Sequence, residues 1–397
     1  MEKKYKLTDE TINISGRTLY RIEALKDFGD VKIGDKGGYI ESEDNLSQSG
    51  NCWVYDDGAS VYGNAIVYGK ASVCDNASVY GNAEVYGMAK ICGNVHVLGN
   101  AKVYGNASVY DNAVVYDDAK VNDDVKVCGS ACVRGNAVIR DNAEVYDNAI
   151  VFDKSIVSGY AKVYGSACVR GNTLIYDNVE VYGNAIVFGS SIISGNAIIC
   201  ERAKVGGNTK VADNARISGN ARIYDNAKIY GYAKVYDHAQ VYDNAIVYGN
   251  TEIFGNTQVY GNAKIYDNAT VYGMAQVYDN ALVYGNTKVY GSAIVYDNAI
   301  VRDNTGVRGN AIVSGNAEIC GDAVITTISD YIFFKNWWSS GRCFTWTRSN
   351  NMWKVGCFYG TGDELIKKAY KDSEKSGREY EKIVRYVESI IEDTVNA

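Results

Sequence analysis

Aliphatic residues recur every six positions along most of the chain. From Val61 to Ile325 in steps of six, all 45 positions are Val or Ile, without insertion or deletion. Four residues after each stands a small residue, mostly Ala and sometimes Thr, Ser or Val. The Gly-Asn or Asp-Asn pair between them is typical of a turn, and we expect Asn to take the left-handed backbone conformation, which it tolerates well.

This hexad predicts short strands that stack on one another. In the unit Ala-x-Val the small and aliphatic side chains point to one face and x points to the other, because side chains alternate along a strand. An apolar period of six does not fit an α-helix, whose period is about 3.6. One hexad cannot bury its apolar face alone, so successive turns of the chain must stack. The sequence therefore predicts an all-β chain with a parallel β-helix over residues 56–326.

The V/I-x-x-x-A-x pattern resembles the hexapeptide repeat of left-handed parallel β-helices, known from bacterial acyltransferases. In that family three hexads make one triangular coil, which implies about 15 coils here. The segments Gly37–Glu41 and Cys52–Val54 resemble the lead-in of uncharacterised bacterial and phage-borne hexapeptide-repeat proteins. The segment Gly356–Thr361 resembles part of a C-terminal module of related phage or prophage proteins. Some of these proteins carry an acetyltransferase label assigned by similarity.

Both ends break the hexad and are predicted to cap the stack, because open strand edges need covering and repeat proteins need atypical terminal units. Residues 1–55 form the predicted N-terminal β cap, with strands such as Leu19–Leu25 and Gly38–Ser42. Residues 327–397 form the predicted C-terminal α+β module. This module contains four of the five tryptophans, namely Trp337, Trp338, Trp346 and Trp353.

Strands and helices are both predicted in the C-terminal module. The strands are Asp330–Lys335, Arg342–Arg348 and Met352–Tyr359. Thr361 or Asp363 is expected to cap a helix that begins near Glu364. A second helix is expected after Ser376-Gly377, with one apolar stripe formed by Tyr380, Val384, Val387 and Ile391.

Composition excludes several classes of function. The formal net charge is −7, so no cationic surface predicts nucleic-acid binding. No stretch approaches the ~18 apolar residues of a membrane span, and no signal peptide is recognisable, so we expect no membrane contact and a cytoplasmic location with reduced thiols. None of the ten cysteines forms a CxxC pair, so we predict no metal site. The single Asp residues at the turns are expected to make local hydrogen bonds.

Only two residues could supply the general base that the resemblance to acyltransferases implies, His96 and His238. His96 stands at an outward x position, and the residues eighteen positions away, Ser78 and Val114, cannot orient its ring. His238 replaces a turn Asn. Acyltransferases of this family also interrupt the repeat with a loop over the substrate, whereas the hexads here are unbroken. We therefore predict no catalytic residue and no cofactor. The alternative is an acyltransferase that uses acetyl-CoA and His96.

Outward x positions at intervals of eighteen define the faces of the predicted prism. Two faces are apolar over four coils, whereas the third, with Glu144, Lys162 and Glu180 before Ile198, is mostly charged. Long exposed apolar patches mark interfaces, although strand propensity alone also favours Ile and Val. We predict a homo-oligomer or a protein partner. The interface residues are Val138, Ile156, Leu174, Ile192, Ile150 and Ile186, beside Cys132 and Cys168.

Two further surface patterns could bind ligands. Tyr follows the aliphatic residue in every hexad from Tyr224 to Tyr296 except at Phe254, which predicts aromatic ladders that either pack or bind carbohydrate. Six successive x positions are basic and could hold an anion. They are Lys204, Lys210, Arg216, Arg222, Lys228 and Lys234.

Together these patterns predict a non-catalytic β-solenoid scaffold or interaction protein. The ends imply a phage or prophage association through their resemblance. The first alternative is the acyl-CoA-dependent acyltransferase, and the second is a carbohydrate-binding rod.

Overall fold

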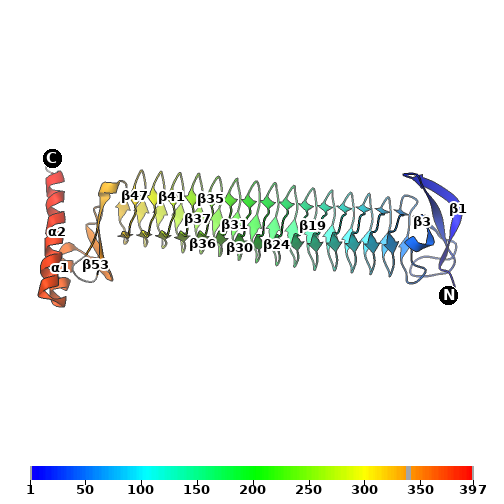
Figure 1. Cartoon of the computed structure of the whole chain (residues 1–397), viewed down its shortest axis with the longest axis horizontal. Helices are drawn as coiled ribbons and strands as arrows, with labels where there is room; N and C mark the ends of the chain where they lie inside the picture. Colours follow the sequence, from blue (N-terminus) through cyan, green and yellow to red (C-terminus); the bar gives the residue numbers. More distant parts are fainter. Residues whose placement is uncertain (1, 337–340, 396–397) are drawn as a thin grey trace. The chain divides into compact units, whose positions relative to one another are not determined.

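A computed structural model describes residues 2–336 and 341–395 of the chain. It falls into two compact units, Met1–Gly231 and Tyr232–Ala397. Each of the 45 hexads supplies one two-residue strand, made of x and the aliphatic residue, from β5 (Ser60–Val61) to β49 (Val324–Ile325) (Figure 1). The chain is thus a β-solenoid in both units. The boundaries near residues 55 and 326, and the left-handed sense of the coil, stay predictions.

Strands pair in parallel with the strand three places further on. Within unit 1, β7 (Ser72–Val73) pairs with β10 (Lys90–Ile91), which pairs with β13 (Ser108–Val109). Positions that face each other are eighteen residues apart, and we call such a set a column. Three hexads therefore make one coil, as the resemblance implied. The outward sides of the three sheets are called face 1 (containing His96), face 2 (containing Ile156) and face 3 (containing Lys90).

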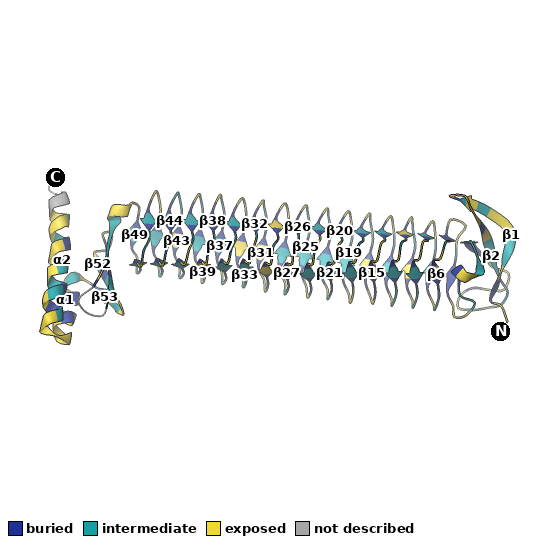
Figure 2. Cartoon of the chain, in the orientation of Figure 1, coloured by how far each residue is buried: buried dark blue, intermediate teal, exposed yellow. Residues whose placement is uncertain are grey.

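Alternation of buried and outward residues gives the solenoid its core. In β22 (Lys162–Val163) Val163 is fully buried and Lys162 points outward, and the preceding Ala161 is fully buried as well. The same alternation recurs along the coils of each unit, with exposed residues mainly at turns and outward positions (Figure 2). Each buried aliphatic side chain contributes roughly 1.5–3 kcal/mol before chain entropy is counted.

The turn corrects one expectation from the sequence. The left-handed conformation falls on the Gly or Asp that precedes Asn, as at Asp147 (φ 58°) before Asn148 and at Gly183 (φ 70°) before Asn184. The Asn side chains instead form ladders between coils: Asn64 Nδ2 donates to Asn82 Oδ1 at 2.9 Å. Gly suits this position because it has no Cβ to clash, which explains its frequency there.

Asp at the same position is stabilised by the next coil. Asp153 Oδ2 accepts a hydrogen bond from the backbone N–H of Gly171 at 3.0 Å, eighteen residues further on. Asp147 does the same with Gly165 at 3.1 Å. Hydrogen bonding is therefore the role of these carboxylates, as expected, but it joins consecutive coils and is not local. The bond offsets the steric cost of a left-handed Asp.

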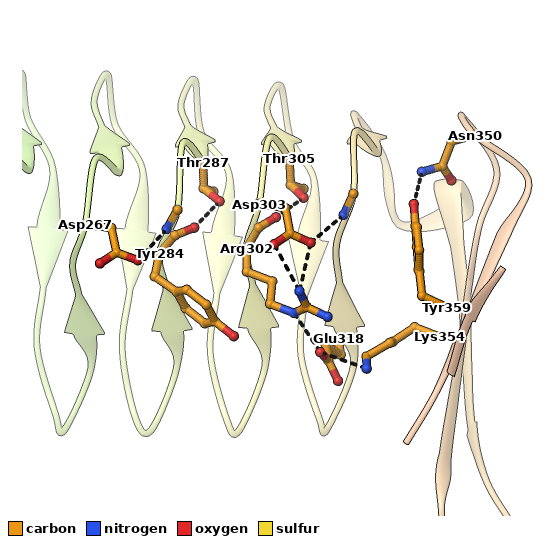
Figure 3. Close-up of polar contacts among 12 residues, drawn as sticks. Asp267, Tyr284, Thr287, Arg302, Asp303, Thr305, Glu318, Asn350, Lys354 and Tyr359 are labelled. Carbon is orange, nitrogen blue, oxygen red and sulfur yellow. Dashed lines mark hydrogen bonds and ion pairs between the residues drawn. The ribbon is translucent and has the colours of Figure 1, made fainter. Parts of the chain in front are cut away.

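Two threonines at the small inward position of the hexad provide a matched pair of substitutions for a stability test. Thr287 Oγ1 donates to the Tyr284 carbonyl oxygen at 2.6 Å (Figure 3), whereas buried Thr251 Oγ1 has no hydrogen-bond partner among the described residues. Thr251→Val is expected to raise the free energy of unfolding by about 1 kcal/mol, because it removes a buried unsatisfied hydroxyl at constant shape. Val fits this position elsewhere, at Val95, Val125 and Val179.

Denaturant unfolding of both variants measures this difference. Thr287→Val is the control and is expected to lower the free energy of unfolding by about 1 kcal/mol, because it loses a made hydrogen bond. Equal destabilisation by both substitutions would contradict the assignment of Thr251 as unsatisfied.

The N-terminal cap joins the first coils through its backbone. β1 (Tyr5–Ile14), β2 (Arg17–Ala24) and β3 (Lys36–Ile40) are antiparallel neighbours, and β3 then pairs in parallel with β5. The two strands expected here are confirmed, each beginning two residues earlier. The first strand of face 3, β4 (Trp53–Val54), carries Trp53, whose buried ring packs edge-on against Phe28 at 5.3 Å between centroids.

The C-terminal module is an antiparallel sheet with two helices. The strands are β50 (Tyr331–Lys335), β51 (Cys343–Thr347), β52 (Met352–Val355) and β53 (Phe358–Gly360), followed by α1 (Gly362–Asp372) and α2 (Glu374–Val395). The strand expected at Met352–Tyr359 is two strands, because Gly356 (φ 56°) turns the chain. The second helix begins before Ser376-Gly377, not after it.

Several expectations for this module are confirmed. Thr361 caps α1 in a capping box with Glu364. The stripe of Tyr380, Val384 and Val387 is buried against Trp346 and Trp353, with Ile391 partly buried beside it. Trp337 and Trp338 lie outside the described residues. Neither of the two described helices is long and apolar enough to cross a membrane.

Candidate functional site

The two histidines lie in different surroundings. His96, in β11 (His96–Val97), is exposed, and its column neighbours are Ser78 and Val114, as expected. The rings of His96 and Tyr80 are T-shaped to each other, with 6.2 Å between their centroids. His238 follows the left-handed Asp237 in a turn, and its backbone N–H donates to the Gly255 carbonyl at 3.0 Å. Neither column neighbour of His96 is an acidic residue that could orient its ring.

The apolar outward residues lie in two continuous columns of unit 1. On face 1, Ile150 lies between Cys132 and Cys168, and Ile186 follows. On face 2, Ile156 pairs with Val138 on one side and Leu174 on the other, and Ile192 follows. Their side chains are half-buried by their neighbours, and Ile150 is 38% exposed. Both columns thus present aliphatic surface to solvent over the same coils.

Face 3 of these coils has the opposite character. Its column runs Lys126, Glu144, Lys162 and Glu180, and Glu144 forms ion pairs with Lys126 at 3.2 Å and Lys162 at 3.9 Å. Because lysines and glutamates alternate along this column, their charges largely cancel. The contrast separates one polar face from two apolar faces at the same level of the solenoid.

The six basic x residues follow the coil around the three faces. Lys204 pairs with Arg222 on face 1, and Lys210 pairs with Lys228 on face 2. Lys234 lies in unit 2, where it forms an ion pair with Glu252 at 2.9 Å. The turn carboxylate of Asp213 accepts from the Gly231 backbone N–H at 2.9 Å. Anion binding by these residues stays a prediction.

Aromatic ladders are confirmed in unit 2. Tyr242, Tyr260, Tyr278 and Tyr296 stack in one ladder with ring centroids 4.7–5.1 Å apart and nearly parallel planes. Because their ring faces pack on one another, mainly their edges remain for other molecules. Sugars bind aromatic residues through the ring face, so this geometry favours packing over the carbohydrate alternative.

The last coils of unit 2 are joined to the C-terminal module by a polar network (Figure 3). Arg302 donates to Glu318 at 2.8 Å and to Asp303 at 2.8 Å, and Lys354 of β52 pairs with Glu318 at 3.5 Å. Burial opposes the charge of Arg302, but the hydrogen bond to Glu318 and the nearby acidic groups raise its pKa. Nearby, burial raises the pKa of the Cys320 thiol to about 11. The network is structural: it positions the module.

A hollow on face 3 was not predicted from the sequence. It measures about 240 Å³ and is lined by Lys90, Cys92, Ser108, Val109, Tyr110 and Lys126. Beside it, a disulfide joins Cys92 to Cys74 in the preceding coil, which corrects the expectation that all thiols are reduced. The Sγ atoms of this pair and a carboxylate oxygen of Asp75 lie within 4.8 Å of one another. The pair was not predicted because its two cysteines do not form a CxxC motif. Their separation of eighteen residues, which is one coil of the solenoid, is the signal that would have revealed it.

Comparison with known proteins identifies the repeat. Four segments, residues 181–195, 215–231, 239–251 and 275–291, match the YdcK β-solenoid repeat. The hexads of this chain are therefore similar to the repeats of a known β-solenoid family. The chain is also similar to a protein of Escherichia coli K12 named "Uncharacterized acetyltransferase YdcK", with 37% identity over 79 residues. The aligned part is 18% of this chain and 24% of that relative. The resemblance to repeat proteins with an acetyltransferase label is confirmed.

Proposed function

We propose that this protein is a non-catalytic scaffold that assembles with further copies of itself through the apolar columns of faces 1 and 2. The observation that carries this proposal is the pair of aliphatic columns at one level of unit 1, beside a charged face 3. Contiguous apolar surface of this kind is unusual on a monomer. The cytoplasmic location, the absence of a cofactor, and a phage or prophage setting stay predictions from the sequence.

The unbroken repeat supports a role without catalysis. Strand follows strand at intervals of six residues from β5 to β49, so no hexad is interrupted by a loop that could close over a substrate. His96 is exposed between Ser78 and Val114, where no acidic column neighbour holds its ring. A general base usually needs such positioning.

Ile156→Lys combined with Leu174→Lys is expected to reduce the assembly to the mass of one chain, 43.3 kDa. Two ammonium groups would have to be buried in an apolar interface, which costs several kcal/mol. Light scattering on a sizing column measures the mass, and circular dichroism confirms that the coils stay folded.

Glu144→Gln combined with Glu180→Gln is the matched control. It makes the same change in net charge at the same level, but on face 3, and it is expected to leave the assembled mass unchanged. A parental chain that already weighs 43.3 kDa, or an assembly that survives the lysines on face 2, would refute self-association through these columns.

A second candidate is an acyl-CoA-dependent acyltransferase, favoured by the name of the similar E. coli protein. In this candidate His96 is the base and acetyl-CoA is the acyl donor. Saturable binding of acetyl-CoA in a calorimetric titration, weakened by His96→Ala, would favour it over the scaffold.

A further inference from the structure

The Cys74–Cys92 disulfide connects consecutive coils at the edge of face 3. Cys74 directly follows β7 and Cys92 directly follows β10, so the pairing of these strands brings their Cα atoms to 4.7 Å. Both residues are half-buried, so solvent reaches this edge. The carboxylate of Asp75 lies beside the pair and accepts a hydrogen bond from the Gly93 backbone at 2.8 Å.

The hollow reaches only one of the two sulfur-bearing residues. Cys92 lines it and Cys74 does not. The hollow exists because Ser108, with its short side chain, stands between Lys90 and Lys126 in the column. Tyr110 forms part of its wall. A small molecule that enters here therefore meets Cys92.

The charge of the hollow favours an anion. Lys90 has Ser72 and Ser108 as column neighbours, so neither neighbour supplies a carboxylate to neutralise it. Lys126, on the far side of Ser108, shares its charge with Glu144 at 3.2 Å. A hydrogen bond with Cys128, followed by burial, raises the pKa of Tyr110 to about 12, so its phenol is neutral at pH 7 and does not repel an anion. Nearby ammonium groups attract carboxylates.

We propose that the hollow binds a small anionic thiol, which exchanges with the disulfide by attacking Cys92. This inference is independent of the proposed scaffold function. The incoming thiol ionises, its sulfur bonds to Cys92 Sγ, and the bond between Cys92 and Cys74 breaks. Cys74 leaves as the thiolate and takes up the proton that the incoming thiol released. One disulfide is consumed and one is formed, so no further oxidant or reductant is needed.

The test uses the full chain, purified without reductant, and two probe thiols. Glutathione carries a net negative charge, and cysteamine carries a positive one. After brief incubation and alkylation of free thiols, peptide mapping by mass spectrometry locates the adduct. With glutathione, we expect the adduct on Cys92 and the alkylated free thiol on Cys74. The amount of adduct on Cys92 is expected to exceed that on Cys74 about tenfold, because only one sulfur is accessible to attack.

Lys90→Gln combined with Lys126→Gln tests the role of charge. This double substitution removes the attraction between the lysines and an anion, so it is expected to slow the reaction with glutathione about fivefold. The reaction with cysteamine, which is positively charged, is not expected to slow. The control is Lys102→Gln combined with Lys120→Gln, two column neighbours on face 2. Adducts mainly on Cys74, equal slowing by the control, or free thiols at both cysteines in the purified chain would each overturn the proposal.

Discussion

Val277→Asp is expected to lower the free energy of unfolding of unit 2 by more than about 4 kcal/mol. Val277 is the inward residue of β41 (Gln276–Val277) and is fully buried. Its column neighbours are Val259 and Val295, both also fully buried. A carboxylate here would be surrounded by aliphatic groups, with neither water nor a cation to stabilise it.

The preceding residue provides the matched control. Gln276→Asp introduces the same side chain into the same strand but on the outward side, so a cost of about 1 kcal/mol or less is expected. Denaturant unfolding gives both free energies. Because each coil contacts only its neighbours, hydrogen exchange of Val277→Asp should show the loss of protection concentrated in the adjoining coils. Similar costs for the two variants would refute the inward orientation of the aliphatic column.

Raising the pH above 10 is expected to unfold the coils that carry the tyrosine ladders. Burial, followed by the neighbouring phenols of its ladder, raises the pKa of Tyr266 from 10.0 to about 12. Burial and stacked neighbours also raise the pKa values of Tyr260 and Tyr278. The folded chain thus holds these protons more tightly than the unfolded chain. Their contribution to stability is complete below pH 10 and is lost as the pH rises toward 12.

An alkaline titration followed by two signals tests this expectation. Tyrosinate absorbance should rise with a midpoint above 10, together with loss of the far-ultraviolet strand signal. Tyr266→Phe removes one titrating group and should move the transition to higher pH. Phe fits such a ladder, because Phe254 stacks between Tyr236 and Tyr272 at centroid distances of 4.9 and 5.0 Å. Tyrosines that titrate at 10 while the coils stay folded would contradict the expectation.

Periodicity was sufficient to predict the solenoid because the repeat leaves few choices. Once Val163 and Ala161 must point inward, Lys162 must point outward, and the six-residue spacing fixes the next strand. The same spacing predicted the aromatic ladders, such as that of Tyr242 and Tyr260, since residues in a column must meet when strands stack in register.

Features that depend on backbone conformation or on single side chains were harder to predict. Asn and the residue before it both tolerate a left-handed backbone, so propensity alone could not place the positive φ on Asp147 instead of Asn148. The early start of α2 likewise has no clear signal, since Gly377 would normally disfavour a helix interior. The hollow beside Cys92 depends on the short side chain of Ser108 between two lysines, which matters only once the columns are known.

The constant register of the columns restricts how such a gene can gain or lose codons. Removing one hexad would shift every later outward residue to the next face, so Leu174 would leave the aliphatic column that it shares with Ile156. The carboxylate of Asp153 accepts a hydrogen bond from the backbone of Gly171, eighteen residues further on, and after such a deletion it would face a different residue. Only duplications or deletions of eighteen residues preserve both. Natural variants of different length are therefore expected to differ by whole coils.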